Sequence, residues 1–547
     1  MSIKSKVEEI SKAFPSLDVV AGSKEEKIVS EKIRGFFEER GLEANTFTFE
    51  AMSWRENCAV VEAGGEKFTA AAMPYTPSGD VEAELLYVGY GIFDEEWHGI
   101  DASGKIVLLK WFDKKIDEVN WQYINAVKYG AEAVIFFDPY PRRRRRMVLT
   151  LSTDYRFGPG TPPYVPSVSV SYEDGMRLLK MRRKKAKVRV YTETRVSHAS
   201  TSYVVYAGSL EGPVFTAHLD KWLTGFTDNV LGTALVVLAA EMFGESTGYI
   251  VFGSEESGAP GYSPWYWIWG SRRFAEHLQD KGVLDDLGVI INFDVLGGEK
   301  IHVSASGPDL EDGLQRLLGD SFLYGPDETI FDSFSFTMKG VPALTFHSYE
   351  DIIPYYHTDM DKPDIVNWEA VEKAFSAATR VAQTFLSKRW KMLNYNSLIQ
   401  RVKERLEAVS YLPEAVDALE VLSHVIIDDE KKARIFRRNL TRPLYHGRYE
   451  VTLHDIVSAY PYLLDQVKDL ITLRNFIQNR GVSYEEVLKV EGYRIISGYE
   501  QILASVETRF WKRNIPSNQV REAYIALENI VRSNILKLKR ILEEMAR

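Results

Sequence analysis

Four apolar runs between residues 212 and 347 constrain the fold of this chain more strongly than any other feature. They are "GPVFTAH" (212–218), "GYIVFGS" (248–254), "GVIINFD" (288–294) and "GVPALTFH" (340–347). Runs that are apolar on both faces and alternate with helical stretches are typical of a parallel sheet covered on both sides. The sequence therefore predicts an α/β fold in which helices sandwich a mixed, mainly parallel sheet. One covering helix is predicted at "NVLGTALVVLAAEMFG" (229–244), where Gly244 ends it.

A chain of 547 residues is too long for one hydrophobic core, so we expect several domains. Residues 76–196 combine strand-like runs with one helical stretch, and hold 20 Lys and Arg against 16 Asp and Glu in a chain of net charge −10. This shift in composition predicts an inserted, β-rich domain. From about residue 390 onward, helical patterns dominate. The predicted domains are an α/β domain at 1–75 and 197–389, the insert at 76–196, and a helical domain at 390–547.

Ionisable residues gather where the apolar runs end. The candidates are His218, Asp220, Asp228, Glu255, Glu256, Asp294, His357 and Asp361. Loops at the carboxyl ends of parallel strands converge on one edge of the sheet, so these side chains are expected to meet there. So many carboxylates would repel one another unless cations lie among them, which predicts two divalent ions. Cys58 is the only cysteine, so the ligands must be His and carboxylate, a set that suits zinc and also accepts cobalt or manganese.

Five motifs carry a resemblance to a known family. "AHLD", "TDN", "SEESG", "NFD" and "YHTDMD" resemble, in order and spacing, the motifs of the M28-type co-catalytic zinc aminopeptidases. That family also includes glutamate carboxypeptidases and the metal-free transferrin receptors. The insert is similar to the protease-associated domain of many members, through "GKIVLLKW", "NAVKYGAEAVIFF" and "PSVSVSYEDG". The resemblance implies the zinc-exopeptidase fold.

The resemblance also implies a role for each candidate. His218 and Asp294 would hold one zinc ion, and Glu256 and His357 the other, while Asp228 would bridge the two. Asp220 would accept the second ring N–H of His218 and so fix its tautomer. The peptide bond between Asp228 and Asn229 would be cis.

Two residues are expected to act on the substrate. Two ions about 3.5–4 Å apart lower the pKa of a shared water toward about 7. Glu255 would take a proton from that water as it attacks a peptide carbonyl, and would pass it to the leaving amine. Tyr356, next to His357, would donate a hydrogen bond to the developing oxyanion, as in the carboxypeptidase branch. Its alternative role is packing beside the ligand loop.

The expected function is a dinuclear zinc aminopeptidase acting on short peptides. A carboxypeptidase of the same fold is the nearest alternative, and it needs a cationic clamp such as Lys221, Lys339, Arg272 or Arg273. A glutaminyl cyclase is disfavoured because those relatives keep one metal. A non-catalytic, receptor-like scaffold is disfavoured because the ligand set is complete.

Two segments depart from the family pattern or from ordinary composition. "APGYSPWYWIW" (259–269) is an aromatic insertion after the paired glutamates, and it either lines a specificity pocket or packs against the insert or the helical tail. "RRRRR" (142–146) is expected to form a solvated face, with binding of an acidic substrate or partner as the alternative.

Charge and hydropathy bear on partners and location. A net charge of −10 argues against nucleic acid as a partner. No run reaches the roughly 18 apolar residues of a membrane span, and "MSIKSKVEEISKAF" lacks the pattern of a secretory signal. We therefore expect a cytoplasmic protein without a membrane partner. The helical domain is expected either to form a homodimer or to cap the active site.

Overall fold

The computed structural model divides into two compact units. The first comprises Met1–Asp286, Ile291–His302 and Phe346–Thr379, and the second Leu287–Ile290, Val303–Thr345 and Arg380–Arg547. The structure describes residues 2–92, 94–112, 119–151, 161–183, 186–262, 267–427, 430–441, 464–483, 486–487, 489–490 and 517–546. The predicted domain limits stay predictions, because the two units do not follow them.

The strands that carry the site lie side by side in the first unit. They are β9 (Val214–His218), β10 (Gly248–Phe252) and β11 (Ile290–Phe293), in the order β11-β9-β10. β9 and β10 are parallel, and every residue of both is buried. This confirms the predicted parallel arrangement for these two runs. The fourth apolar run forms β14 (Ala343–His347).

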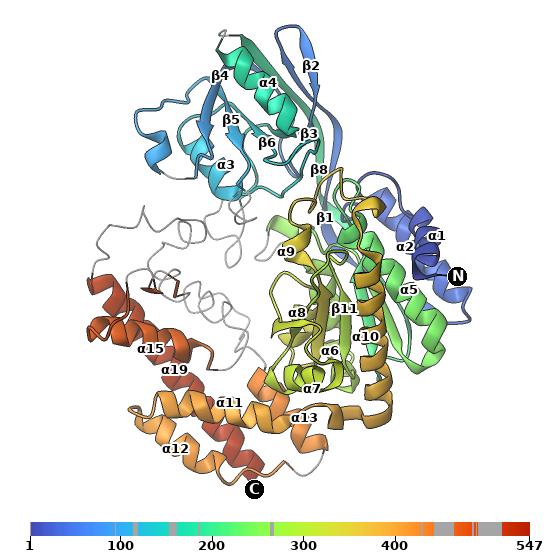
Figure 1. Ribbon diagram of the computed structural model, residues 1–547, viewed down its shortest axis with the longest axis vertical. Coiled ribbons are helices and arrows are strands. Elements are labelled where there is room, and N and C mark those ends of the chain that lie inside the picture. Colours follow the sequence, from blue (N-terminus) through green and yellow to red (C-terminus); the bar gives the residue numbers. More distant parts are fainter. Residues whose placement is uncertain are drawn as a thin grey trace. The chain divides into compact units, whose positions relative to one another are not determined.

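Helices of the first unit cover these strands. α2 (Lys24–Glu38) packs on β8 (Lys187–Gly208), and α5 (Leu231–Phe243) packs on β9 and β10. In Figure 1, α1 (Ile3–Ile10) and α2 lie next to α5. The stretch Phe226–Ser246 has the length and hydropathy of a membrane span, but 83% of its apolar window is buried inside the protein. It is the core helix that the sequence predicts.

Two long strands, β1 (Ala44–Ala63) and β8, connect the insert to the sheet. β1 pairs with β8 along nearly its whole length, from Ala44–Ala207 to Ala63–Val188. One end of β8 pairs with β10 and the other end pairs with β4 (Gly79–Gly89) (Figure 1). The predicted limit between residues 196 and 197 therefore falls inside a continuous strand.

The insert is β-rich, as predicted. Beyond β4 the strand order continues with β5 (Lys105–Lys110), β6 (Ala133–Phe137), β7 (Ser167–Val170) and β3 (Ala71–Ala72). β4 to β7 run parallel to one another, and β3 is antiparallel to β7. Its other elements are β2 (Glu66–Thr69), α3 (Val119–Lys128) and α4 (Tyr172–Arg182).

The second unit contains the short strands β12 (His302–Ala305) and β13 (Leu323–Pro326), in the order β13-β12-β14, with α7 (Pro308–Leu318) and α8 (Ser333–Thr337). Its tail is helical, as predicted. The helices are α11 (Tyr395–Ala408), α12 (Pro413–Leu422), α13 (Glu430–Thr441), α15 (Gln466–Ile477) and α19 (Ser517–Ala546). Leucine and valine side chains of these helices form one buried core.

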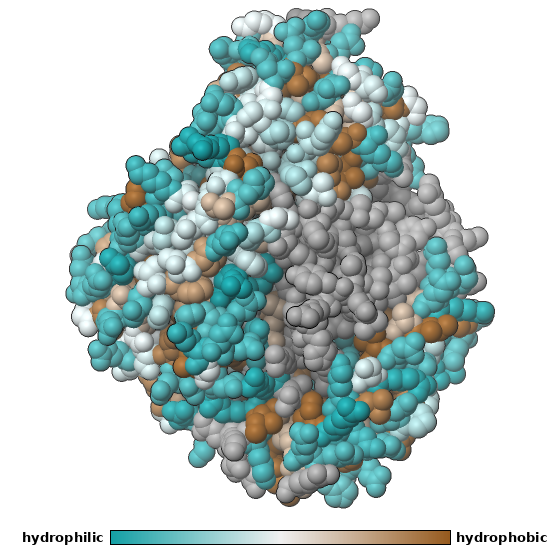
Figure 2. Space-filling model, turned by 180° about the vertical axis from the view of Figure 1, so that it is seen from behind, coloured by the Kyte–Doolittle hydropathy of each residue, from teal (hydrophilic) through white to brown (hydrophobic). Residues whose placement is uncertain are grey.

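Two smaller features of the fold are a helix cap in the second unit and the mixed composition of the surface. Ser483 and Glu486 form a capping box, since they exchange side-chain-to-backbone hydrogen bonds, as the sequence "SYEE" (483–486) predicts. The sequence "TLHD" (452–455) also predicts a capping box, and it lies outside the described residues. On the face shown in Figure 2, hydrophobic residues are scattered among hydrophilic ones.

Candidate metal centre

Four of the candidates lie at the carboxyl ends of β9, β10 and β11, at one edge of the sheet. His218 is the last residue of β9, and Asp294 directly follows β11. Glu255 and Glu256 follow β10 after a two-residue turn. All four side chains are buried. Adjacent strands ending at one level therefore bring together residues that are far apart in sequence.

Asp228 lies between the two histidines. Its Oδ1 is 3.2 Å from Nε2 of His218, and its Oδ2 is 3.3 Å from Nε2 of His357. Each imidazole has a further carboxylate: Asp294 Oδ1 is 3.3 Å from His218 Nε2, and Glu256 Oε2 is 2.8 Å from His357 Nε2. The site is thus two His–carboxylate pairs that share one carboxylate.

These separations match those between ligands of one metal ion. Bonds of 2.0–2.1 Å place two ligands of a tetrahedral zinc ion about 3.3 Å apart. Two buried carboxylate oxygens, Glu256 Oε1 and Asp294 Oδ2, also have no hydrogen-bond partner among the described residues. Among those residues, His218, Glu255 and Asp294 form one group able to hold an ion, and Asp228, Glu256 and His357 form another. The donor set and its unpaired atoms therefore fit two metal ions.

Glu255 stands apart from the other carboxylates. Its Oε2 is 3.9 Å from His218 Nε2, whereas Asp228 Oδ1 is 3.2 Å from the same nitrogen. The longer distance exceeds the spacing of two ligands on one ion, and the shorter one matches it. The geometry therefore favours Asp228 over Glu255 as the ligand shared with His218.

The charges of the site perturb one another strongly. Burial opposes ionisation of Asp228, but the hydrogen bonds and charges of His218 and His357 outweigh it and lower the pKa of the carboxyl. Burial raises the pKa of Glu256 to about 8, although His357 opposes the shift. For His357, burial lowers the pKa, but Glu256 and Asp228 overcome this and raise it to about 9. Metal ions would have to displace these protons on binding.

Three backbone positions around the site have left-handed geometry without being glycine. Ser254, before Glu255, has φ 57°, Val295, after Asp294, has φ 42°, and His357 itself has φ 58°. A β-branched residue such as Val295 is rarely found there. Such positions persist only where the surroundings enforce them, and they cluster at functional sites. The peptide bond between Asp228 and Asn229 is cis, as predicted.

Asp220 accepts the second ring N–H of His218, as predicted, but through its main chain. The ring Nδ1 of His218 lies 3.0 Å from the main-chain carbonyl oxygen of Asp220, and 3.7 Å from its carboxylate. The carboxylate instead accepts the backbone N–H groups of Glu255 and Glu256, at 3.0 and 2.9 Å. Because two adjacent N–H groups point at it, Asp220 fixes the turn that aims both glutamates.

The loop that carries Asp228 is held from both sides. The carboxylate of Asp361 accepts the N–H and hydroxyl of Thr227 and the N–H of Asp228. Asn229 donates to the Phe293 carbonyl and accepts the N–H of Gly232 at the start of α5. A side chain at Gly232 would place its Cβ 2.1 Å from Asn229 Oδ1, so only glycine fits there. The sequence placed Asp361 at this edge but gave it no task.

Glu26 is a contributor that the sequence does not reveal. It lies on α2, is fully buried, and accepts the Gly22 N–H at 2.7 Å and the Ser202 hydroxyl at 2.6 Å. Burial and the nearby charge of Asp220 raise its pKa well above the normal value. "KEEKIVSEKI" shows three glutamates in a helical pattern, and the apolar periodicity alone does not say which one is buried.

Tyr356 packs beside the ligand loop, which is one of its two predicted roles; the other, as a hydrogen-bond donor, stays a prediction. Its ring stacks on the His357 ring at 3.7 Å between centroids, and meets Tyr349 edge to face. Burial, Tyr349 and the charges of the site carboxylates raise the pKa of its hydroxyl. The side chain therefore packs beside the ligand loop and also senses the charge of the metal centre.

The aromatic insertion is described only in part, since residues 263–266 lie outside the described residues. Trp269 opens α6 (Trp269–Asp280), and its Nε1–H donates to the Glu50 carbonyl on β1 at 2.9 Å. The guanidinium groups of Arg272 and Arg273 lie over its ring. Trp269 thus packs against β1, a partner that was not among those considered.

The prediction that residues 142–146 form a solvated face is wrong for three of the five arginines. Arg143, Arg145 and Arg146 are 8%, 2% and 4% exposed. They are buried because carboxylates, carbonyl oxygens and aromatic faces surround their guanidinium groups. A run of like charges in sequence does not reveal such partners.

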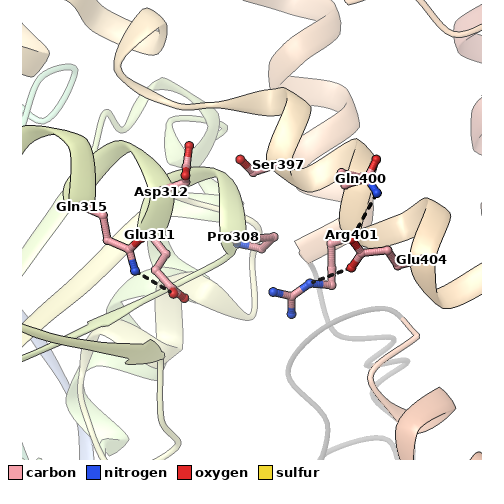
Figure 3. A pocket seen from close by; sticks show the side chains of 8 residues that line it. All are labelled: Pro308, Glu311, Asp312, Gln315, Ser397, Gln400, Arg401 and Glu404. Atoms are coloured by element: carbon pink, nitrogen blue, oxygen red, sulfur yellow. Dashed lines mark hydrogen bonds and ion pairs between the residues drawn. The ribbon is translucent and has the colours of Figure 1, made fainter.

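A hollow in the second unit offers no comparable chemistry. It encloses about 290 Å³ between α7 and α11 (Figure 3). Its charged and amide side chains pair along their own helices, Gln315 with Glu311 on α7, and Gln400 and Arg401 with Glu404 on α11. These are ordinary contacts of a solvated helix surface.

Comparisons with known proteins agree with this geometry. Residues 208–382 match the peptidase family M28, and residues 57–178 match the PA domain. Among curated proteins, none matches this chain in sequence.

Solved structures share the fold. A zinc aminopeptidase from Bacillus subtilis is 19% identical with a TM-score of 0.54, and the match covers 70% of this chain and 93% of that one. A peptidase M28 precursor from Shewanella amazonensis SB2B is 16% identical with a TM-score of 0.55, covering 70% of this chain and 92% of that one. With its histidines and carboxylates at the edge of an M28 sheet, this chain is a metallo-exopeptidase that has a peptidase family M28 domain and an inserted PA domain.

Proposed function

We propose that this chain is a dinuclear zinc aminopeptidase that hydrolyses short peptides. The observation that carries the proposal is the position of Asp228, whose two carboxylate oxygens face the two imidazoles at 3.2 and 3.3 Å. A carboxylate shared in this way is the bridge of a two-metal site. His218 and Asp294 are proposed to hold one ion, and Glu256 and His357 the other.

Two zinc ions at this centre would act as Lewis acids and lower the pKa of a water toward about 7. Glu255 is proposed as the general base and then the general acid, taking a proton from the attacking water and giving it to the leaving amine. Its distance from His218 Nε2, 3.9 Å, supports a role outside the ligand set. Asp220 fixes the backbone of Glu255 and so orients the base.

Tyr356 is proposed to donate a hydrogen bond to the oxyanion that develops on the peptide carbonyl. The stacking of its ring on His357 supports this, because it ties the hydroxyl to the ligand loop.

The end of the peptide that is cleaved is inferred from two further observations. A similar fold belongs to a zinc aminopeptidase, which favours removal of N-terminal residues. Two of the four cations considered as a carboxylate clamp are used within the protein: Lys221 is buried and donates to the carbonyls of Leu17 and Leu223, and Arg272 donates to the carbonyl of Trp267. Both observations favour an aminopeptidase over a carboxypeptidase. A homodimer through residues 390–547 and a cytoplasmic location stay predictions from the sequence.

The test combines one variant with two peptide libraries. Wild-type protein loaded with zinc is assayed on N-blocked and C-blocked peptides, and is expected to cleave only those with a free N-terminus. Glu255→Ala is expected to lose at least about 100-fold in kcat while keeping two zinc ions per chain. Glu211→Ala, at an exposed glutamate, is the matched control.

The outcomes separate the alternatives. Cleavage of N-blocked peptides only would establish a carboxypeptidase. A Glu255→Ala protein that loses zinc would make Glu255 a ligand. Wild-type protein that holds two zinc ions but cleaves neither library would be a scaffold.

A further inference from the structure

The arginine run of the inserted PA domain pairs with the loop that carries His357. Arg145 and Thr358 form an antiparallel bridge. The Arg146 N–H donates to the His357 carbonyl at 3.0 Å, and the His357 Nδ1–H donates back to the Arg146 carbonyl at 3.1 Å. The second hydrogen bond fixes the ring tautomer so that Nε2 faces Glu256 and Asp228. A metal-ligating histidine is therefore oriented by a residue of the insert.

The Arg145 guanidinium also contacts the backbone of the loop that carries His357. The side chain is buried and donates to the carbonyls of Ile353 and Pro354, each at 3.1 Å, and to that of Tyr356. Its remaining charge is met by Asp138, at 2.8 Å from Nε, and by the face of Trp111. A planar fork of donors suits several carbonyls at once, which an ammonium group cannot match.

Neighbouring arginines extend the contact on both sides. Arg144 donates to the Asp359 carboxylate from its backbone and its side chain, at 2.9 and 2.8 Å. Arg146 joins Asp18 and Glu56 at 2.9 and 2.7 Å. We call Arg144, Arg145 and Arg146 the arginine clamp.

The loop needs such support for two reasons. The carbonyls of residues 353–356 follow the short helix α9 (Tyr349–Ile352), whose end leaves acceptors without helical partners. His357 then adopts φ 58°, a conformation that persists only where its surroundings enforce it. The clamp donates to three of these carbonyls, those of Ile353, Pro354 and Tyr356. It also forms an isolated β-bridge next to His357, between Arg145 and Thr358.

We propose that the arginine clamp positions His357 for metal binding, so that the PA domain controls the affinity of one of the two metal ions. The inference rests on the proposed two-metal function. In it, Arg145 is a positioning residue: it touches neither metal nor substrate, and acts through the backbone of the His357 loop. The ion held by His218 and Asp294 lies outside its reach, since those ligands stand on β9 and after β11.

The test measures zinc affinity rather than activity. Full-length protein stripped with a chelator is titrated with Zn²⁺ in competition with a chromophoric chelator. The main variant is the double substitution Arg145→Met with Asp138→Asn, which removes the guanidinium and neutralises its buried partner. Asp359→Asn is a milder variant that removes only the partly exposed ion pair between Arg144 and Asp359. Arg189→Met is the control, because the ion pairs of Arg189 are with Asp80 and Glu62.

The expected result is selective. The double variant should bind one zinc ion about 10–100-fold more weakly and the other within about twofold of wild type, as for loss of a hydrogen bond that orients a ligand. Asp359→Asn should weaken the same ion to a smaller degree, and Arg145→Lys should fall between wild type and the double variant. Arg189→Met should bind both ions as wild type does.

Two results would overturn the inference: unchanged affinity for both ions in both clamp variants, or an equal loss for both ions that follows the fall in Tm of the metal-free protein. The wild-type titration reports separately on the proposed function. Binding of fewer than two zinc ions by the wild type would refute the two-metal site itself, whereas two ions in the wild type with unchanged affinities in every variant would refute only the clamp.

Discussion

Two buried clusters of charge in this molecule differ in how their charges are met. In the second unit, the fully buried Arg437 joins Asp309 at 2.8 Å and donates to the Gly340 carbonyl and to Ser306. In the first unit, the candidate metal centre places four carboxylates around two imidazoles and so holds an excess of negative charge. A buried charge with one opposite partner is a structural element, whereas a buried excess of one charge marks a place for an ion.

The largest effect is expected from removing the shared carboxylate. Asp228→Asn keeps the shape of the side chain but removes the charge that faces both imidazoles. We expect loss of both zinc ions and a fall in activity of about 10³-fold or more, since the two-metal arrangement carries the chemistry. Elemental analysis and a peptide assay on the same preparation measure both. A variant that keeps two zinc ions would show that Asp228 resembles Asp309 more than a bridging ligand.

The corresponding change in the second cluster should affect stability instead. Arg437→Met leaves Asp309 buried without its cation, so we expect the free energy of unfolding to fall by about 3–5 kcal/mol. Zinc affinity should stay as in wild type. Urea unfolding and zinc titration test the two halves of the statement, and Arg437→Met with Asp309→Asn should recover part of the loss. Zinc loss in the folded single variant would erase the distinction between the clusters.

A pH series tests the protons of the candidate metal centre without mutation. The pKa is raised to about 8 in Glu256, to about 7 in Asp361 and to about 9 in His357, with burial the main cause for the two carboxyls and the charges of Glu256 and Asp228 for the histidine. The folded metal-free chain therefore holds these protons more tightly than the unfolded chain does. Their contribution to stability is present at acid pH and is lost as the pH rises through about 7 to 9. Asp228 has a lowered pKa, and its opposite contribution is already complete at pH 5.

The Tm of the metal-free protein is thus expected to fall between pH 5 and pH 9, while zinc affinity rises over the same range because metal and protons compete. Scanning calorimetry in matched buffers, with and without zinc, measures both trends. A Tm of the metal-free protein that rises with pH would contradict the assignment of these protons.

The smallest effect concerns the aromatic insertion. Trp269→Phe removes the hydrogen bond to the Glu50 carbonyl but keeps an aromatic ring under Arg272 and Arg273. We expect a loss of about 0.5–1.5 kcal/mol in the free energy of unfolding and kcat/KM within about twofold of wild type. Chemical denaturation and a peptide panel provide the measurements. A change in side-chain preference at unchanged stability would place Trp269 in a specificity pocket instead.

Sequence reasoning predicted the sheet of the first unit and the candidate site well, because both depend on local patterns. Runs such as 214–218 and 248–252 are apolar throughout and form buried strands. Since such strands end at one edge, the residues that follow them could be grouped before any coordinates were known. The structure brings His218, Asp228, Glu255, Glu256, Asp294 and His357 together, whereas their roles rest on the resemblance and stay proposals.

What the sequence missed depends on contacts between distant segments. The arginine run looked solvated because charge density is read from neighbours in sequence, and the partners of Arg145 lie more than 200 residues away at Ile353 and Pro354. The sequence predicted that Asp220 accepts the second ring N–H of His218, but a motif does not distinguish a main-chain carbonyl, which accepts it, from the carboxylate, which holds the backbone of the glutamates. The sequence did not indicate that Glu26, rather than another glutamate of the same helix, is buried.

The pairing of β1 with β8 also sets an order of events during synthesis. Ala44 meets Ala207, so β1 stays without its partner until the whole insert has left the ribosome. Contacts of such long sequence separation form late and slow the folding of a domain. Because β8 also pairs with β4 inside the insert, folding of the insert would bring β8 beside β1. Deleting the insert is therefore expected to lower the yield of folded enzyme as well as its metal affinity.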